Sequence, residues 1–222
     1  MPQTEIAEST LEYQGTLTTP AAALLPQRDA LAAGLFTALA PLGLALADVH
    51  VDDDPSGSLA SAIVAELGPG GVYRFTFDGV QWTTLDPDLR DPATIVKPLA
   101  LGRNWLKTAA PSAAFEKHQL TFSAHHLVLD GTVESAMAGL RAPTLAALGE
   151  ARPTGVVFRA VQTARNLEVE FTVDRSSVYD AALFASLTLI QRGGTWDPAN
   201  LLRDLAALYG RALAGIGVTP PK

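Results

Sequence analysis

Hydrophobic and polar residues alternate along several stretches of the chain, and this two-residue period predicts strands. Two of these stretches are clear hairpins. One turns at Asp78-Gly79, a dipeptide typical of a tight two-residue turn, and the other turns at residues 163–166. The expected strands are 11–19, 44–51, 72–77, 80–85, 118–129, 156–162 and 167–175.

Apolar residues three and four positions apart predict helices in other parts of the chain. The clearest one spans 197–217, with Asp197 as N-cap and Pro198 in the first turn. Segment 176–193 is apolar on nearly every face and opens with Ser177 and Asp180 in the spacing of a capping box, so we expect a helix buried at the centre. The remaining expected helices are 26–43, 59–68, 132–140 and 143–151.

Strand, helix and hairpin occur in both halves of the chain, which indicates an α+β fold. We expect antiparallel hairpins or a sheet with helices packed on it, built as two similar halves. Leu99, Leu101, Trp105 and Leu106 predict that an otherwise irregular connecting segment packs onto the body. The expected organisation is a flexible tail (1–10), an N-terminal α+β half (11–85), the irregular connecting segment (86–115) and a C-terminal α+β half (116–217).

Composition narrows the function. The 222 residues are 48% hydrophobic and 18% charged, with a net charge of −7, which disfavours binding to nucleic acid or to an anionic membrane. The chain has no cysteine, so disulfides, thiolate metal sites and thiol nucleophiles are excluded. The first ten residues lack the basic and apolar regions of a secretory signal, and no apolar run has transmembrane length, so we expect a cytoplasmic protein. The low charge and the apolar segment 176–193 predict a homodimer.

No metal or cofactor site is expected. Asp52, Asp54, Ser56 and Gly57 match the opening of a calcium-binding loop, but the twelfth position, which needs a glutamate, is Ile63. We therefore interpret this stretch as an acidic turn.

The stretch SAHHLVLDG (123–131) carries the main candidate for chemistry. His125, His126, Asp130 and Gly131 fit the pattern HHxxxDG in every fixed letter, at the end of an expected strand and before an expected helix. An imidazole titrates near neutral pH and can act as a general base without a large change in pKa.

In these residues the chain resembles the acyltransferase superfamily that includes chloramphenicol acetyltransferases and the condensation domains of peptide synthetases. The resemblance implies that His126 is the general base, which deprotonates an acceptor that then attacks a thioester carbonyl. Asp130 would be structural and paired with an arginine. His125 and Gly131 would belong to the binding site, with Gly131 allowing the acyl carrier to approach. The substrate would be an acyl-CoA or a phosphopantetheine thioester.

The alternative interpretation is structural. His125 and His126 are then two strand residues that face opposite sides of a sheet, Asp130 caps the next helix, and Gly131 supplies a turn. Two functions follow from these interpretations. The first is a protein-interaction or assembly module without catalytic activity, whose protein partner the sequence does not identify. The second is a thioester-dependent acyltransferase.

Overall fold

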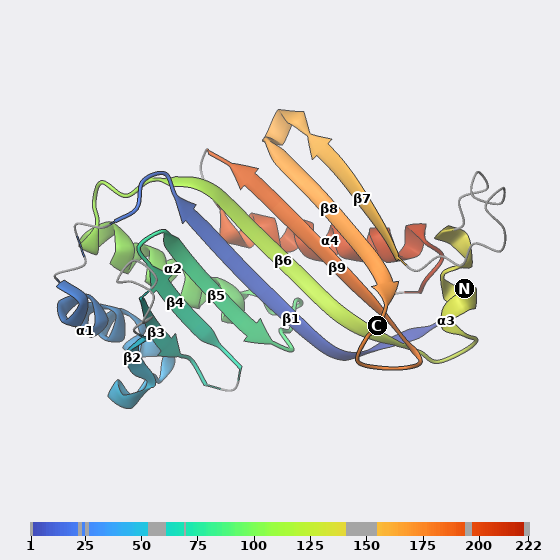
Figure 1. Ribbon diagram of the computed structural model, residues 1–222, viewed down its shortest axis with the longest axis horizontal. Coiled ribbons are helices and arrows are strands. Elements are labelled where there is room, and N and C mark those ends of the chain that lie inside the picture. Colours follow the sequence, from blue (N-terminus) through green and yellow to red (C-terminus); the bar gives the residue numbers. More distant parts are fainter. Residues whose placement is uncertain are drawn as a thin grey trace.

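A nine-stranded antiparallel sheet dominates the computed structural model, in the order β2-β3-β4-β5-β1-β6-β9-β8-β7, with helices packed on one of its faces (Figure 1). The fold is therefore α+β, as expected. The structure describes residues 2–21, 24, 27–52, 61–68, 70–140, 155–193 and 197–219. The strands are β1 (Thr4–Leu17), β2 (Val49–Asp52), β3 (Ala62–Glu66), β4 (Val72–Thr76), β5 (Gly79–Leu85), β6 (Phe115–Val128), β7 (Gly155–Gln162), β8 (Leu167–Arg175) and β9 (Ala182–Arg192). The α-helices are α1 (Arg28–Leu39), α2 (Pro92–Ala109), α3 (Val133–Ala136) and α4 (Pro198–Gly215).

The two longest strands, β1 and β6, lie side by side in the middle of the sheet. Each has 14 residues, and they pair antiparallel with Leu11 opposite Phe122 near the centre of both strands. Residues before β6 supply β2 to β5 on one side of this pair, and residues after β6 supply β7 to β9 on the other side. Helix α2 covers the first group of strands and α4 covers the second (Figure 1).

The core lies between the sheet and the helices. Alternate strand residues point towards the helices and are buried, such as Leu11 and Tyr13 of β1, Phe122 of β6 and Leu187 of β9. On the opposite face the central strands carry polar side chains that bond across strands, as in the hydrogen bond of 3.0 Å between the hydroxyls of Thr121 and Thr188. Within the described residues, no helix is long and apolar enough to cross a membrane.

Both expected hairpins are present, as β4–β5 and β7–β8, and the expected strand 118–129 corresponds to β6. Helix α4 also begins as predicted, because the carboxylate of Asp197 accepts hydrogen bonds from the backbone N–H groups of Ala199 and Asn200. Of the strand expected over 44–51, only the end is extended, as β2, after a short 3-10 turn at Leu46–Asp48. The helix expected over 143–151 lies outside the described residues, as do Asp54, Ser56 and Gly57 of the acidic turn.

The helix predicted over 176–193 is wrong, because most of this segment, Ala182–Arg192, forms strand β9. Leu183, Ala185, Leu187 and Leu189 face the core, and the residues between them form the half-buried opposite face. Since β9 is an interior strand with apolar residues on both faces, its sequence lacks a clean alternation.

Segment 59–68 was also expected to be a helix and contains strand β3. Its apolar run is buried on both faces between β2 and β4, and a run this short does not distinguish strand from helix. The expected flexible tail, 1–10, is wrong for a different reason. Strand β1 begins at Thr4, because backbone pairing with β6 orders these polar residues.

The connecting segment 86–115 is not irregular, since it contains the 18-residue helix α2. Pro98 and Gly102 lie inside this helix, and both residues disfavour a helix interior in an isolated chain. The predicted packing is present, since Leu99, Trp105 and Leu106 are buried in the core and Leu101 is partly buried against it. Tertiary packing thus compensates for weak local propensity.

Candidate functional site

His126, the expected general base, lies in the core between the sheet and α4. Strand β6 directs its ring towards the helices, and the residue is only 1% exposed. Both ring nitrogens have partners. Nε2 lies 2.6 Å from the hydroxyl of Tyr209 in α4, and Nδ1 lies 3.4 Å from the hydroxyl of Thr4 in β1.

The two partners of His126 form further hydrogen bonds within the protein. The Tyr209 hydroxyl also contacts the carbonyl of Ala185 at 3.3 Å, and the Thr4 hydroxyl contacts the carbonyl of Thr219 at 3.1 Å. Either tautomer of His126 can therefore be satisfied within the protein. Burial, with a smaller contribution from His125, lowers the pKa of His126 to about 4. A base with so low a pKa accepts a proton poorly from an acceptor group at neutral pH.

His125 points to the opposite face of the sheet. Its Nδ1 lies 2.9 Å from the hydroxyl of Ser176, which also accepts hydrogen bonds from the backbone of Val178 and Tyr179. The ring is half-buried against Tyr179 and Phe184. The two histidines thus lie on different faces of the sheet and do not form one site.

Asp130 and Gly131 form the turn after β6. Asp130 is exposed, and its carboxylate accepts a hydrogen bond from the backbone N–H of Gln3, so it fixes the start of the chain. Among the described residues, no arginine forms an ion pair with it. The cap of α3 is Thr132, which forms a capping box with Ser135, so the prediction that Asp130 caps this helix is wrong. Gly131 has a φ of +99°, which explains a glycine at the turn.

A groove of about 670 Å³ opens beside this network, between α4 and the segment that precedes α2. Tyr209 and Phe122 line it together with the small residues Ala206 and Gly210. The ring of Tyr209 stacks on that of His126 with the centroids 5.8 Å apart. Tyr209, rather than His126, is therefore the member of the pair that borders open space.

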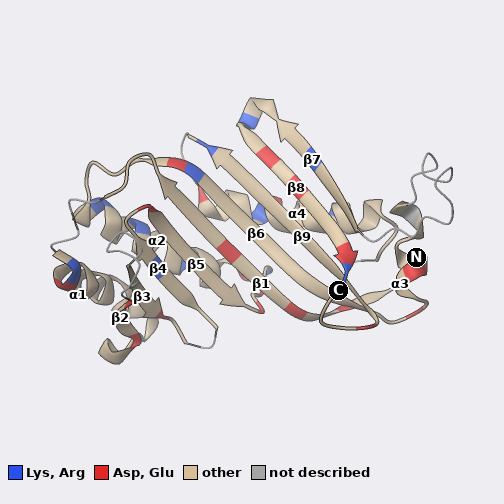
Figure 2. Cartoon of the chain, in the orientation of Figure 1, with Lys and Arg blue, Asp and Glu red and all other residues tan. Residues whose placement is uncertain are grey.

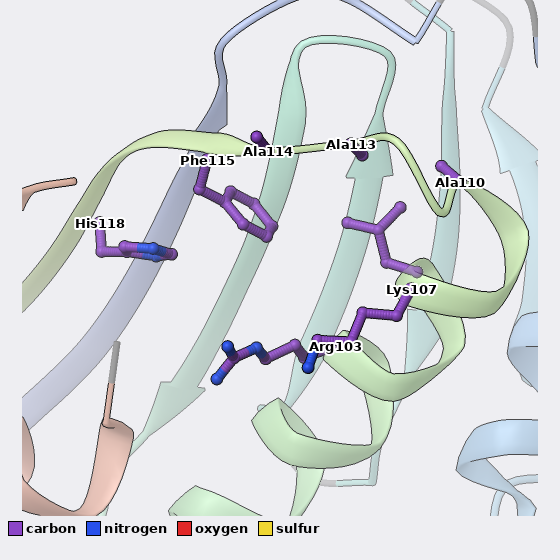
Figure 3. A pocket seen from close by; sticks show the side chains of 8 residues that line it. Arg103, Lys107, Ala110, Ala113, Ala114, Phe115 and His118 are labelled. Atoms are coloured by element: carbon purple, nitrogen blue, oxygen red, sulfur yellow. The ribbon is translucent and has the colours of Figure 1, made fainter. Parts of the chain in front are cut away.

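A second pocket, of about 260 Å³, lies at the C-terminal end of α2 (Figure 3). Arg103 and Lys107 of α2 and Phe115 and His118 of β6 face it. The His118 Nδ1 lies 2.8 Å from the Tyr13 hydroxyl, and the two rings stack. Burial and then the charge of Arg103 lower the pKa of His118 to about 4. The sequence alone does not single out these residues, because α2 and β6 form a common pocket only in the folded chain.

Within the described residues, no group of three or more His, Asp or Glu side chains is placed to hold a metal ion. Neither the comparison with protein-family models nor that with curated proteins found a match for this chain.

Proposed function

We propose that this protein is a non-catalytic interaction module that works as a homodimer, joined through the edge strand β7. The observation that carries the proposal is the exposure of large apolar side chains on this strand. Val157 is 54% exposed, Phe158 46% and Val161 69%. Exposed apolar residues on an unpaired edge form a surface to which another strand can add.

The environment of His126 supports a role without catalysis. A general base needs a lone pair within reach of its substrate, but both nitrogens of this buried ring contact protein groups. The resemblance to acyltransferases rests on HHxxxDG alone, and the described residues give Asp130 no arginine partner. Acyl transfer through His126 therefore stays the alternative, and it requires the Tyr209 contact to open.

The two edges of the sheet differ in a way that favours β7 as the pairing edge. Strand β2, at the other edge, has four residues and carries Asp52, which forms an ion pair with Arg74. Short, charged edges resist the addition of another strand. Strand β7 has eight residues, and Arg159 is its only charged residue.

The protein carries a net charge of −7, but the charges near β7 do not oppose the association of two copies at this edge. Figure 2 shows that the acidic positions of this region lie on β8 and not on β7. Glu170 is paired with Arg159 at 2.7 Å and Glu168 with Arg192 at 3.0 Å. Local ion pairs therefore compensate these carboxylates, and the edge itself presents no unpaired negative charge among the described residues.

We infer that the two halves of the chain are versions of one α+β unit. In each half a 14-residue strand leads to a helix, then to further antiparallel strands, and finally to an 18-residue helix that an Asp-Pro-Ala sequence opens, with the Asp as its N-cap. Strands β1 and β6 join these units edge to edge within one chain. Pairing of β7 with β7 of a second copy would repeat this mode of association.

The register of such a dimer can be specified. In a two-fold pairing of one strand with its copy, each residue faces a residue on the same side of the sheet. A centre at Arg159 would place two guanidinium groups opposite each other, which is unfavourable. A centre at Phe158 places ring opposite ring and Arg159 opposite the partner copy's residue 157. We therefore propose that the axis passes through Phe158.

The absence of cysteine from the chain allows a direct test, because an introduced cysteine is the sole thiol. Directly opposed residues in antiparallel strands lie within about 4.5–5.5 Å, close enough for a disulfide. Under mild oxidation, Phe158→Cys is expected to form a covalent dimer. The control Ala160→Cys lies on the same face of β7 and would not meet its own copy. Equal cross-linking of both variants would contradict the register.

The dimer itself is tested by analytical ultracentrifugation. Phe158→Lys places two buried charges at the contact and is expected to raise the dimer dissociation constant at least about tenfold. Val178→Lys, at an exposed site outside β7, is the matched control and should leave the dimer intact. A wild-type protein that sediments as a monomer at micromolar concentration would overturn the proposal.

A further inference from the structure

The pocket at the end of α2 (Figure 3) has the chemistry of an anion site, although the protein as a whole is acidic. Among the described residues that line it there are two cationic side chains, Arg103 and Lys107, and no carboxylate. His118 contributes no charge near pH 7, because burial and Arg103 hold its pKa near 4. The described part of the lining therefore carries two positive charges.

The two cations of the pocket differ in their position relative to the end of α2. A basic side chain in the last turn of a helix interacts favourably with the carbonyl end, and Lys107 is placed in this way. The effect is confined to about the last turn, and Arg103 lies six residues before the end of α2 at Ala109. The Arg103 guanidinium instead extends towards the Phe115 and His118 side of the pocket (Figure 3).

The two halves place different residues at corresponding positions of their 18-residue helix and 14-residue strand. Tyr209 stands twelve residues after the cap Asp197 of α4, and Arg103 stands twelve residues after the cap Asp91 of α2. His126 is the twelfth residue of β6, and Gly15 is the twelfth residue of β1. The stacked pair of Tyr209 and His126 in one half thus corresponds to Arg103 and a residue without a side chain in the other.

Aromatic side chains occupy the position beside Gly15. A Cβ atom at Gly15 would lie 2.5 Å from the Tyr13 hydroxyl and 2.7 Å from the Phe115 ring, so a larger residue there would displace one or both rings. Phe115 is in turn a wall of the pocket, together with Leu106 and the alanines at 110, 113 and 114. The lining therefore joins a cationic side to an aromatic and aliphatic side.

We propose that this pocket binds a small organic anion. Its carboxylate or phosphate group would pair with Arg103 and Lys107, and its apolar body would lie against Phe115 and the alanines. The guanidinium fork suits either anion, since both present two oxygens in one plane. A volume of about 260 Å³ is close to the lower limit for small-molecule pockets, so a body of about one ring fits. This proposal is independent of the dimer through β7.

The test is an NMR titration of the isotope-labelled full chain with benzoate and with phenyl phosphate, and benzyl alcohol as the uncharged comparator. We expect saturable shifts of amide signals within 103–118 with one or both anions and none with the alcohol. Binding of only one anion would define the group that the pocket recognises. Affinity should fall as the salt concentration rises, because screening weakens the ion pair.

Variants separate a specific site from general attraction. Arg103→Gln is expected to weaken binding at least about tenfold, since it removes a charge-assisted contact. Lys107→Gln, at an exposed position that leaves folding intact, should weaken it several-fold. Arg211→Gln, on the exposed side of α4, and Lys117→Gln, on the opposite face of β6, are matched controls and should have no effect.

Three results would overturn the proposal. The first is the absence of saturable binding of both anions at millimolar concentration. The second is unchanged affinity in Lys107→Gln together with unchanged affinity in a folded Arg103→Gln variant. The third is a set of shifted amides that lies outside 103–118. The Lys107 variant and the mapping on the wild-type chain keep the test decisive even if Arg103→Gln fails to fold.

Discussion

The hydroxyl of Tyr209 lies 2.6 Å from Nε2 of His126 and joins α4 to the central strand β6. Both residues are buried, so loss of one partner leaves a polar atom without water. We expect Tyr209→Phe to lower the free energy of unfolding by about 1–3 kcal/mol. Urea denaturation at pH 7 measures this change.

Tyr179→Phe is the matched control for that substitution, because it also removes one hydroxyl. The Tyr179 hydroxyl bonds to Glu8 at 3.2 Å on the exposed side of the molecule, so its loss should change stability by less than about 0.5 kcal/mol. Equal effects of the two substitutions on the free energy of unfolding would contradict the prediction that the buried Tyr209–His126 hydrogen bond contributes more to stability than the exposed Tyr179–Glu8 hydrogen bond.

Stability should fall as the pH is lowered below neutrality. Burial lowers the pKa of His118 and of His126 from about 6.5 to about 4 in the folded protein. Between these values the unfolded chain binds protons that the folded protein does not, and stability therefore falls as pH falls through this window. Each ring contributes at most about 3 kcal/mol to the loss at the acid end of it.

The His118→Gln and His126→Gln double variant tests this pH dependence. Its free energy of unfolding, measured in urea at pH 7, 5.5 and 4.5, should change less with pH than that of the wild-type protein. For each protein the free energy of unfolding at pH 5.5 and 4.5 is compared with its own value at pH 7. A general loss of stability in the double variant therefore does not change the measured pH dependence. An identical slope in both proteins would contradict the assignment.

Two helical glycines are expected to respond in opposite ways to substitution by alanine. A Cβ atom at Gly102 in α2 would lie 2.4 Å from the buried ring of Tyr73, whereas one at Gly210 in α4 would meet nothing within 4 Å. Gly210→Ala should stabilise the protein by about 0.5–1 kcal/mol through helix propensity. Gly102→Ala should destabilise it by about 1–3 kcal/mol, because the tightly packed core does not yield without cost. Thermal denaturation of both variants checks the opposite signs, and stabilisation by both would contradict the packing at Tyr73.

Local chemistry was sufficient to predict the parts of the fold in which it agrees with tertiary packing. The β4–β5 hairpin was predictable because its strands alternate around Asp78-Gly79, and α4 was predictable because Asp197 and Pro198 mark its start. Strand β9 was not predictable in this way. As an interior strand it has apolar residues on both faces, and its sequence therefore resembles a buried helix.

A start signal for α2 was nevertheless present in the sequence. Asp91-Pro92-Ala93 repeats the Asp197-Pro198-Ala199 that opens α4, although Pro98 and Gly102 lower the helix propensity of the residues that follow. Of the candidate site, the sequence identified His126 and correctly placed it on a strand. Its partner Tyr209 lies 83 residues away, and no local pattern connects the two residues. The pocket beside Arg103 depends in the same way on elements that only the folded chain brings together.

Acyl transfer offers the sharpest test between the two functions. If the protein is a non-catalytic module, purified wild-type chain should give no transfer above background from acetyl-CoA or acyl-pantetheine to amine, hydroxyl or thiol acceptors. His126→Ala should then act on stability alone and cost about 2–4 kcal/mol, because it removes a buried, hydrogen-bonded ring. Asp130→Asn keeps an oxygen that can accept from the Gln3 N–H, so it should change stability by less than about 0.5 kcal/mol. The acyltransferase alternative predicts measurable turnover in the wild-type chain that falls roughly a hundredfold or more in His126→Ala. It also predicts that Asp130→Asn costs more stability than His126→Ala. This turnover would be detected as release of free CoA. If it is lost in His126→Ala under conditions where that variant remains folded, the protein is an enzyme and the proposal of a non-catalytic interaction module is wrong.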